Sequence, residues 1–160
     1  MRKRDLLFSK ILVPLDGSEH SFKALNAAVE IAKKFNGDIT LIHIYSVGTR
    51  SIVFPEQASF ATSIPIITPA EYSRIAEVMR EAGVRILAEG EERVRAEGVR
   101  VEKLLKERHV VHEIVKAAGE GGFNLIVMGA RGVSRIKEVI LGSVSDGVIR
   151  NAPCPVLIVK

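Results

Sequence analysis

The chain has 160 residues, enough for one domain with a buried core, and 47% of them are hydrophobic while 26% are charged. The formal net charge is +4, but Lys and Arg alternate with Glu along the chain, which disfavours nucleic-acid binding because that activity usually gathers basic residues on one face. One cysteine excludes an internal disulfide, and no hydrophobic run approaches the about 20 residues of a membrane span. The apolar stretch near the N-terminus is too short for a secretory signal. We therefore expect one cytoplasmic domain over residues 1–160 that binds neither nucleic acid nor a membrane.

The first 45 residues predict a strand, a helix and a second strand. Residues 10–16 (KILVPLD) are apolar and β-branched and end at an Asp-Gly turn, which is typical of a buried strand. A helix follows, with Ser18 as its N-cap and Asn36-Gly37 as its end, where we expect Gly37 to adopt the left-handed conformation. Residues 38–45 (DITLIHIY) form the second strand. This order implies a parallel pair joined by a right-handed crossover.

Residues 46–69 interrupt the alternation. They contain three prolines and scattered Ser and Thr without a clear period, so we expect a long loop, of the kind that is often functional or disordered. Their apolar residues argue against simple disorder and favour a segment that covers a sheet edge, a ligand or a second subunit.

The second half of the chain continues to alternate helix and strand. A helix is predicted over 70–97, with Gly83 and Gly90 weakening it. Its apolar stripe is Ile75, Val78, Met79, Ala82, Ile86, Leu87 and Val94. Strands are expected at 98–107, 123–129 and 155–160, and helices at 110–120 and 143–151. The order β-α-β-α-β-α-β-α-β indicates an α/β fold: an open, doubly wound five-stranded parallel sheet with helices on both faces.

Three glycines in VMGARGVSRIKEVILGSVSD (127–146) raise the question of a ligand. Gly129 and Gly132 follow an apolar strand, and Gly142 precedes Ser143 at the start of a helix. If the first and fourth strands flank the point where strand order reverses, these segments meet beyond the strand ends, where such sheets bind ligands. The first amides of a helix attract phosphate, and a glycine lets the ligand approach closely. Taken separately, each glycine is equally explained by a turn or a helix cap.

The pattern G-x2-G-x9-G-S at 129–143, together with ILVPLDGSEHS and PCPVLIVK, resembles the universal stress protein family in its ATP-binding branch. The resemblance covers practically the whole chain. It implies a Rossmann-like sheet of order 3-2-1-4-5, ATP at the point where the strand order reverses, and a homodimer.

Carried over by position, the resemblance implies adenine, ribose and phosphate contacts. These fall on Pro14, Leu15, Asp16, Ile44, Met128, Gly129, Gly132, Gly142, Ser143 and Val144. Asp16 could accept the ribose hydroxyls or hold a metal-bound water, or it could serve only as the first residue of an Asp-Gly turn. For Met128 the alternative is core packing.

The chain departs from the family's pattern before its third helix. Many relatives carry Gly-x-Pro there, where this chain has Arg108, His109 and Val110. Arg108 and Arg131 could meet phosphate oxygens or lie on the surface; we expect Arg108 at the surface and leave Arg131 open. The histidines lack metal-ligand spacing, so no metal site of protein ligands is expected, and Mg²⁺ would be held by phosphates and water.

The sequence thus favours an ATP-binding stress-response or signalling module without catalytic residues. One alternative is a slow Mg-dependent ATPase, since no Walker lysine or obvious base is present to support faster hydrolysis. Another is an interaction protein that acts through its dimer surface without nucleotide. The apolar strand at 155–160 is expected to pair two copies into a homodimer.

Overall fold

The computed structural model describes residues 7–47, 68–132 and 141–160, and it confirms the predicted α/β fold. Five parallel strands are hydrogen-bonded in the order β3-β2-β1-β4-β5. In chain order the elements are β1 (Lys10–Pro14), α1 (Glu19–Phe35), β2 (Asp38–Tyr45), α2 (Pro69–Ala96), β3 (Val101–Glu107), α3 (Val110–Glu120), β4 (Leu125–Gly129), α4 (Ser143–Asn151) and β5 (Val156–Val159).

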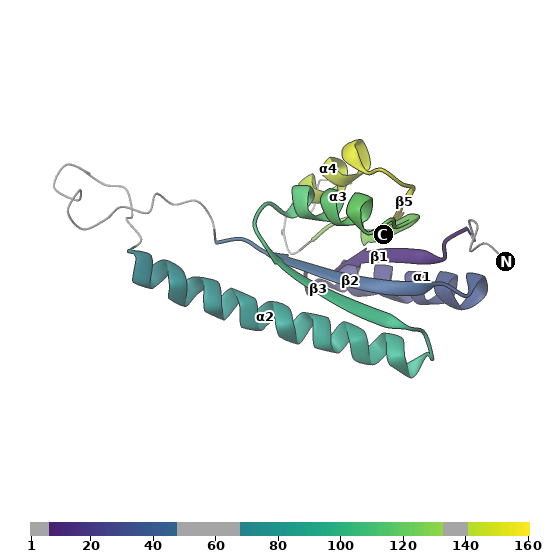
Figure 1. Ribbon diagram of the computed structural model, residues 1–160, viewed down its shortest axis with the longest axis horizontal. Helices are drawn as coiled ribbons and strands as arrows, with labels where there is room; N and C mark the ends of the chain where they lie inside the picture. Colours follow the sequence, from purple (N-terminus) through teal and green to yellow (C-terminus); the bar gives the residue numbers. More distant parts are fainter. Residues whose placement is uncertain (1–6, 48–67, 133–140) are drawn as a thin grey trace.

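Helices cover the sheet on both faces, and alternate residues of each strand build two separate cores (Figure 1). Ile11 and Val13 of β1 belong to the core that α1 and α2 cover, whereas Leu12 belongs to the core beneath α3 and α4. This alternation follows from the two-residue period of a strand. Most strand residues are therefore apolar, as expected for a parallel sheet buried on both faces.

The strand order reverses between β1 and β4. The chain moves outwards from β1 to β2 and β3, and then returns to the other side of β1, where Ile11 pairs with Leu125. The carboxyl ends of β1 and β4 therefore lie side by side, as the sequence predicted. This is the position at which open α/β sheets bind their ligands.

The caps of α1 show one prediction confirmed and one corrected. The Ser18 hydroxyl accepts a hydrogen bond from the Ser21 N–H at 3.1 Å, as an N-cap should. At the other end Asn36, not Gly37, is the left-handed residue, with φ of 52°. Asn tolerates this conformation because its short polar side chain bonds locally. Gly37 is required for another reason: a Cβ there would collide with the carbonyl oxygen of Phe8.

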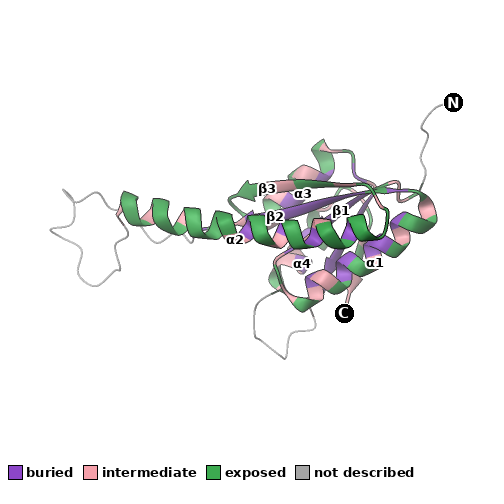
Figure 2. Ribbon diagram, turned by 90° about the horizontal axis from the view of Figure 1, so that it is seen from below, coloured by how far each residue is buried: buried purple, intermediate pink, exposed green. Residues whose placement is uncertain are grey.

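The packing face of α2 differs from the predicted stripe. Its buried residues are Gly83, Leu87, Gly90 and Val94, one continuous face of the helix, whereas Val78 is 60% exposed. The two glycines predicted to weaken α2 are thus the points at which it approaches the sheet. Leu87 and Val94 of the predicted stripe are buried, so its second half is confirmed. Figure 2 shows why its first half stays exposed: the first half of α2 extends beyond the sheet.

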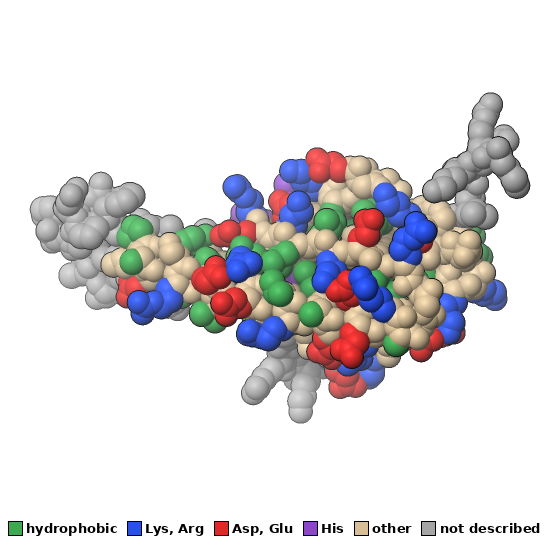
Figure 3. Space-filling view, turned by 60° about the horizontal axis from the view of Figure 1, so that its bottom comes forward, with side chains coloured by type: hydrophobic (Ala, Val, Ile, Leu, Met, Phe, Trp, Pro, Cys, Tyr) green, Lys and Arg blue, Asp and Glu red, His purple; other side chains and the backbone are tan. Residues whose placement is uncertain are grey.

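On the surface formed by α2, charged side chains of both signs alternate with hydrophobic ones (Figure 3). Several Glu–Arg pairs run along this helix, including Glu77 with Arg80 and Glu89 with Arg93. Within the described parts of the chain, no helix combines the length and the apolar character that crossing a bilayer requires. Most of the loop predicted at 46–69 lies outside the described residues.

Candidate functional site

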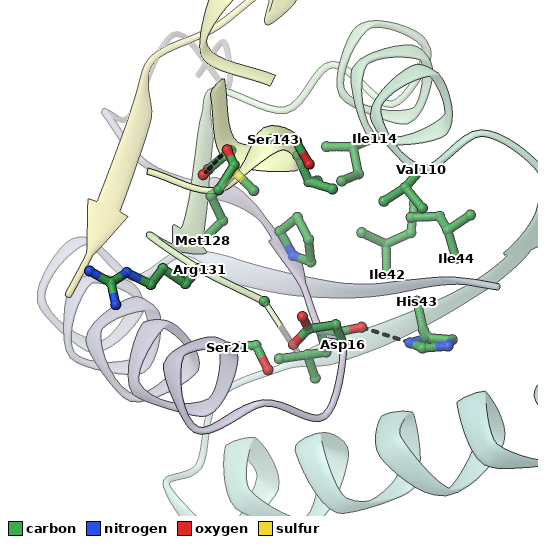
Figure 4. Close-up of a pocket in the computed structure, with 17 residues that line it drawn as sticks. Asp16, Ser21, Ile42, His43, Ile44, Val110, Ile114, Met128, Arg131 and Ser143 are labelled. Carbon is green, nitrogen blue, oxygen red and sulfur yellow. Dashed lines mark hydrogen bonds between the residues drawn. The ribbon is translucent and has the colours of Figure 1, made fainter. Parts of the chain in front are cut away.

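A cavity of about 360 Å³ opens at the carboxyl ends of β1, β2 and β4 (Figure 4). Its volume lies within the usual range of small-molecule sites. The structure brings all eleven predicted site residues to this one cavity: Pro14, Leu15, Asp16, Ile44, Met128, Gly129, Arg131, Gly132, Gly142, Ser143 and Val144.

One side of the cavity is an apolar slot. Figure 4 shows Ile44 of β2 beside Val110 and Ile114 of α3. Ile42 and Met128 complete this side, and Met128, 5% exposed, also packs in the core below. The sequence analysis missed Ile42, Val110 and Ile114, although Ile42 shares the strand face of Ile44 and the other two lie one helical turn apart. These side chains offer an apolar surface on which a flat ring can pack.

Asp16 forms the turn that the sequence left open as one of its roles, and it also lies at the cavity. Its Oδ1 accepts a hydrogen bond from the Ser18 N–H at 2.9 Å, and Gly17 has a φ of 82°, so the residue does form a turn. Its carboxylate also lines the cavity, and a Cβ on Gly132 would collide with Oδ2. The end of β1 and the loop after β4 are therefore in contact through Asp16 and Gly132.

The start of α4 is bound directly to the loop after β4. The carbonyl of Ala130 accepts hydrogen bonds from the Gly142 N–H at 2.8 Å and from the Ser145 hydroxyl at 2.9 Å. The same hydroxyl lies 2.8 Å from the Gly142 carbonyl, and Ser145 is 2% exposed. The sequence analysis missed Ser145, a buried hydroxyl that joins the two glycine segments. Because α4 begins here, the amides of its first turn have no partner within the helix.

The glycines of the motif have different structural requirements. A Cβ on Gly129 would lie within 2.8–2.9 Å of the His20 backbone, so α1 can pack on β4 only if this residue is glycine. Gly142 has an ordinary φ of −72°, and a Cβ there would have 3.4 Å to Ala130 O and 3.6 Å to Ser145 Oγ. Among the described residues, nothing therefore prevents a side chain at Gly142. Gly142 is the N-cap of α4, so such a side chain would stand at the same helix end as the first amides.

The two arginines in question occupy different environments. Arg131 is half-buried and lines the cavity. Arg108 is exposed, as predicted, and lies outside the lining of the cavity. Its φ of 144° is a conformation that favours glycine, so this chain keeps the backbone shape of a glycine position with an arginine in place. Helix α3 starts two residues later, without a side-chain cap at His109.

Two tyrosine hydroxyls donate hydrogen bonds to one carboxylate beside the site. Nothing in the sequence indicated this contact. Glu107 accepts hydrogen bonds from Tyr45 at 3.3 Å and from Tyr72 at 3.0 Å. Burial, followed by the charge of Glu107, raises the pKa of Tyr45, and the hydrogen bond to Glu107 is the main cause of the raised pKa of Tyr72. Both phenols therefore stay neutral donors at ordinary pH. They connect the end of β2 to the first turns of α2.

Comparison with known proteins agrees with this architecture. The family model described as "Universal stress protein family" matches residues 7–160. The chain belongs to the universal stress protein family. It is 38% identical over 154 residues to universal stress protein YxiE of Bacillus subtilis strain 168, an alignment that covers 96% of this chain and 100% of that protein.

Solved structures of the family share the fold. Universal stress protein UspA from Lactobacillus plantarum superposes with a TM-score of 0.78 at 22% identity, covering 96% of this chain and 98% of that one. A universal stress protein in complex with cAMP superposes with a TM-score of 0.64 at 25% identity, covering 96% and 98% of the two chains. That protein therefore binds an adenine nucleotide.

Proposed function

We propose that the cavity binds ATP and that this universal stress protein acts as a nucleotide-dependent module in a stress response or in signalling. The observation that carries the proposal is Gly142. Its φ is ordinary, and a Cβ there would lie at least 3.4 Å from the described residues around it, yet it stands at the N-cap of α4, beside amides that have no partner within the helix. An anion that approaches these amides explains the glycine, because a helix N-terminus attracts phosphate.

The rest of the cavity fits the other parts of an adenine nucleotide. The apolar slot between Ile44 and Ile114 accepts the base, and the Asp16 carboxylate can accept hydrogen bonds from ribose hydroxyls. Ser143 lies at the start of α4, and its hydroxyl can donate to a phosphate oxygen. Arg131 also lines the cavity, but its guanidinium points away from Asp16 and Ser143 in Figure 4, so it would have to turn inwards to reach a phosphate. Mg²⁺, held by the phosphates and by water, would supply further positive charge. The cAMP complex of a family member supports the nucleotide class.

Calorimetric titration tests the proposal with ATP, ADP, AMP, adenosine and GTP as ligands. We expect ATP to bind more tightly than adenosine, because only ATP reaches the amides of α4 and Arg131. Mass spectrometry of the small molecules that co-purify with the protein gives an independent identification. Equal affinity for ATP and adenosine would show that the phosphates bind elsewhere, and the absence of all nucleotide binding would reject the proposal.

A homodimer through β5 is the second part of the proposal. β5 is an edge strand of the sheet, and its Leu157 is 38% exposed. An exposed apolar edge readily pairs with another strand, and symmetric pairing of two copies closes it. Light scattering at micromolar concentration should give twice the chain mass. A monomer under these conditions would reject this part alone.

A further inference from the structure

The histidine of β2 is a buried polar side chain to which the proposed function assigns no role. His43 is 8% exposed. Its neighbours Ile42 and Ile44 belong to the core on the α3 side of the sheet, so its own ring lies on the opposite face, against α2. Burying a polar ring costs free energy unless the ring is hydrogen-bonded, so its partner indicates what it does.

That partner is the backbone at the end of β1. His43 Nδ1 lies 2.7 Å from the carbonyl oxygen of Leu15 (Figure 4). Because a carbonyl only accepts, Nδ1 must carry the proton and donate. The Leu15 N–H in turn donates to the carbonyl of Ile42 at 2.9 Å. Both peptide groups of Leu15 are therefore held by adjacent residues of β2.

Asp16 follows directly after this carbonyl, so the position of its carboxylate depends on the same contact. Oδ1 of this carboxylate accepts a hydrogen bond from the Ser18 N–H. Oδ2 lies so close to Gly132 that a Cβ on that residue would collide with it. A shift of the Leu15 peptide would move the carboxylate relative to the glycine loop. The carboxylate can accept hydrogen bonds from ribose hydroxyls only if its position in the cavity is fixed.

Helix α2 holds the histidine ring from the other side. A Cβ on Gly83 would lie 2.5 Å from His43 Cδ2 and 3.0 Å from Nε2, so the ring fits only because this residue of α2 is glycine. Gly83 is itself buried in the packing face of α2. The ring is thus confined between α2 and β1, so its Nδ1–H can point only towards the Leu15 carbonyl.

We propose that His43 is the positioning residue of the nucleotide site: it donates to the Leu15 carbonyl and thereby fixes the Asp16 carboxylate beside Gly132, while Gly83 of α2 leaves the space that confines the ring. The inference rests on the proposed function, since it assigns Asp16 to the ribose. His43 is itself among the residues that line the cavity, and the role assigned to it is to act through Asp16.

The test compares two substitutions, His43→Leu and His43→Asn, with a control variant. For each protein, calorimetry measures the ATP affinity and thermal unfolding measures the stability. Leu removes the donor, and the loss of one positioning hydrogen bond should weaken ATP binding about tenfold. Asn carries an amide nitrogen in the place of Nδ1, so it should restore affinity to within about threefold of the wild type. Thr40→Val, which changes another buried polar side chain of β2 outside the cavity, should alter affinity less than about twofold.

A double variant separates positioning from a direct contact. If His43 acts through Asp16, adding His43→Leu to Asp16→Ala should weaken binding by no more than about twofold beyond Asp16→Ala alone, because coupled residues are not additive. A further tenfold loss in the double variant would overturn the proposal. Equal affinity of wild type and His43→Leu would overturn it too, as would equally weak binding by folded Leu and Asn variants.

The ring tautomer gives a test that does not depend on the folding of a variant. Nitrogen NMR of the wild-type chain should show His43 protonated at Nδ1, the state that the hydrogen bond to Leu15 selects. Protonation at Nε2 alone would overturn the proposal. If the wild-type chain binds no nucleotide, the proposed function fails and this inference fails with it; if only the His43 variants behave contrary to expectation, the proposed function stands.

Discussion

Two regions of this chain contain glycines for different physical reasons. On α2, Gly90 is buried, and a Cβ there would lie 2.6 Å from Leu15 Cδ1 and 3.0 Å from Leu41 Cδ1. At the start of α4, the nearest atom of the described residues to a Cβ on Gly142 would lie at 3.4 Å. The first glycine belongs to the packing of the folded chain itself, because two leucine side chains would have to shift to admit a Cβ. For the second we propose a molecule that approaches from outside, so that the same sequence letter marks a packing residue in one region and a binding residue in the other.

Substituting Gly142 should produce the largest effect, and on binding alone. In Gly142→Val the side chain covers the amides of α4, so we expect ATP affinity to fall at least about 100-fold, or ~2.7 kcal/mol. The free energy of unfolding should fall by no more than about 1 kcal/mol, because Val is a poorer N-cap than Gly. Calorimetry and denaturant unfolding measure the two quantities. Gly119→Val is the matched control, since within the described parts of the chain a Cβ on Gly119 would have Pro153 as its nearest neighbour, at 3.9 Å.

Gly90→Val should show the reverse pattern. The extra methyl groups have no room between Leu15 and Leu41, and overpacking of this kind lowers the free energy of unfolding by about 2 kcal/mol. ATP affinity of the folded fraction should change much less than in Gly142→Val. Ala88→Val, on the exposed face of α2, is the control and should unfold like the wild type. A Gly90 variant that keeps full stability would remove the contrast between the two regions.

Ser145→Ala should affect both properties moderately, because Ser145 connects the two glycine segments. Losing its hydrogen bonds to Ala130 and Gly142 should lower the free energy of unfolding by about 1 kcal/mol. ATP affinity should fall a few-fold, because the amides of α4 are then less well fixed beside the loop after β4. The Gly142 N–H still donates to Ala130, so binding is not abolished. Unchanged stability and unchanged affinity together would show that this connection is dispensable.

The smallest effect is expected at Arg108, where the backbone favours a glycine that the chain lacks. Arg108→Gly relieves a φ of 144° but also gives the unfolded chain more freedom, so we expect a net gain of about 0.5 kcal/mol in the free energy of unfolding. ATP affinity should stay within about twofold, since Arg108 does not line the cavity. If thermal unfolding shows that the variant is less stable, the arginine side chain makes a contact that stabilises the fold by more than the backbone strain destabilises it.

Much of the site was predictable because its residues lie in segments that carry their own signals. The turn at Asp16 and the glycines around 129–143 stand at the ends of strongly apolar strands, and parallel strands end at the same edge of a sheet. Ser145 and His43 had no such signal. A serine in a helix and a histidine in a strand are common, and their roles depend on carbonyl groups of Ala130 and Leu15 that are distant in sequence.

By itself, the sequence determined the order of strands and helices and the parallel sheet, because periodicity and turn chemistry are local properties, while the full set of residues at the carboxyl edge was implied by the family resemblance. Only the tertiary structure decided which glycines are needed for packing, that the first half of the predicted stripe of α2 stays exposed, and that Asn36 rather than Gly37 ends α1. These outcomes depend on which atoms of distant segments come within a few ångströms of one another, and that distance is set only when the helices pack on the sheet.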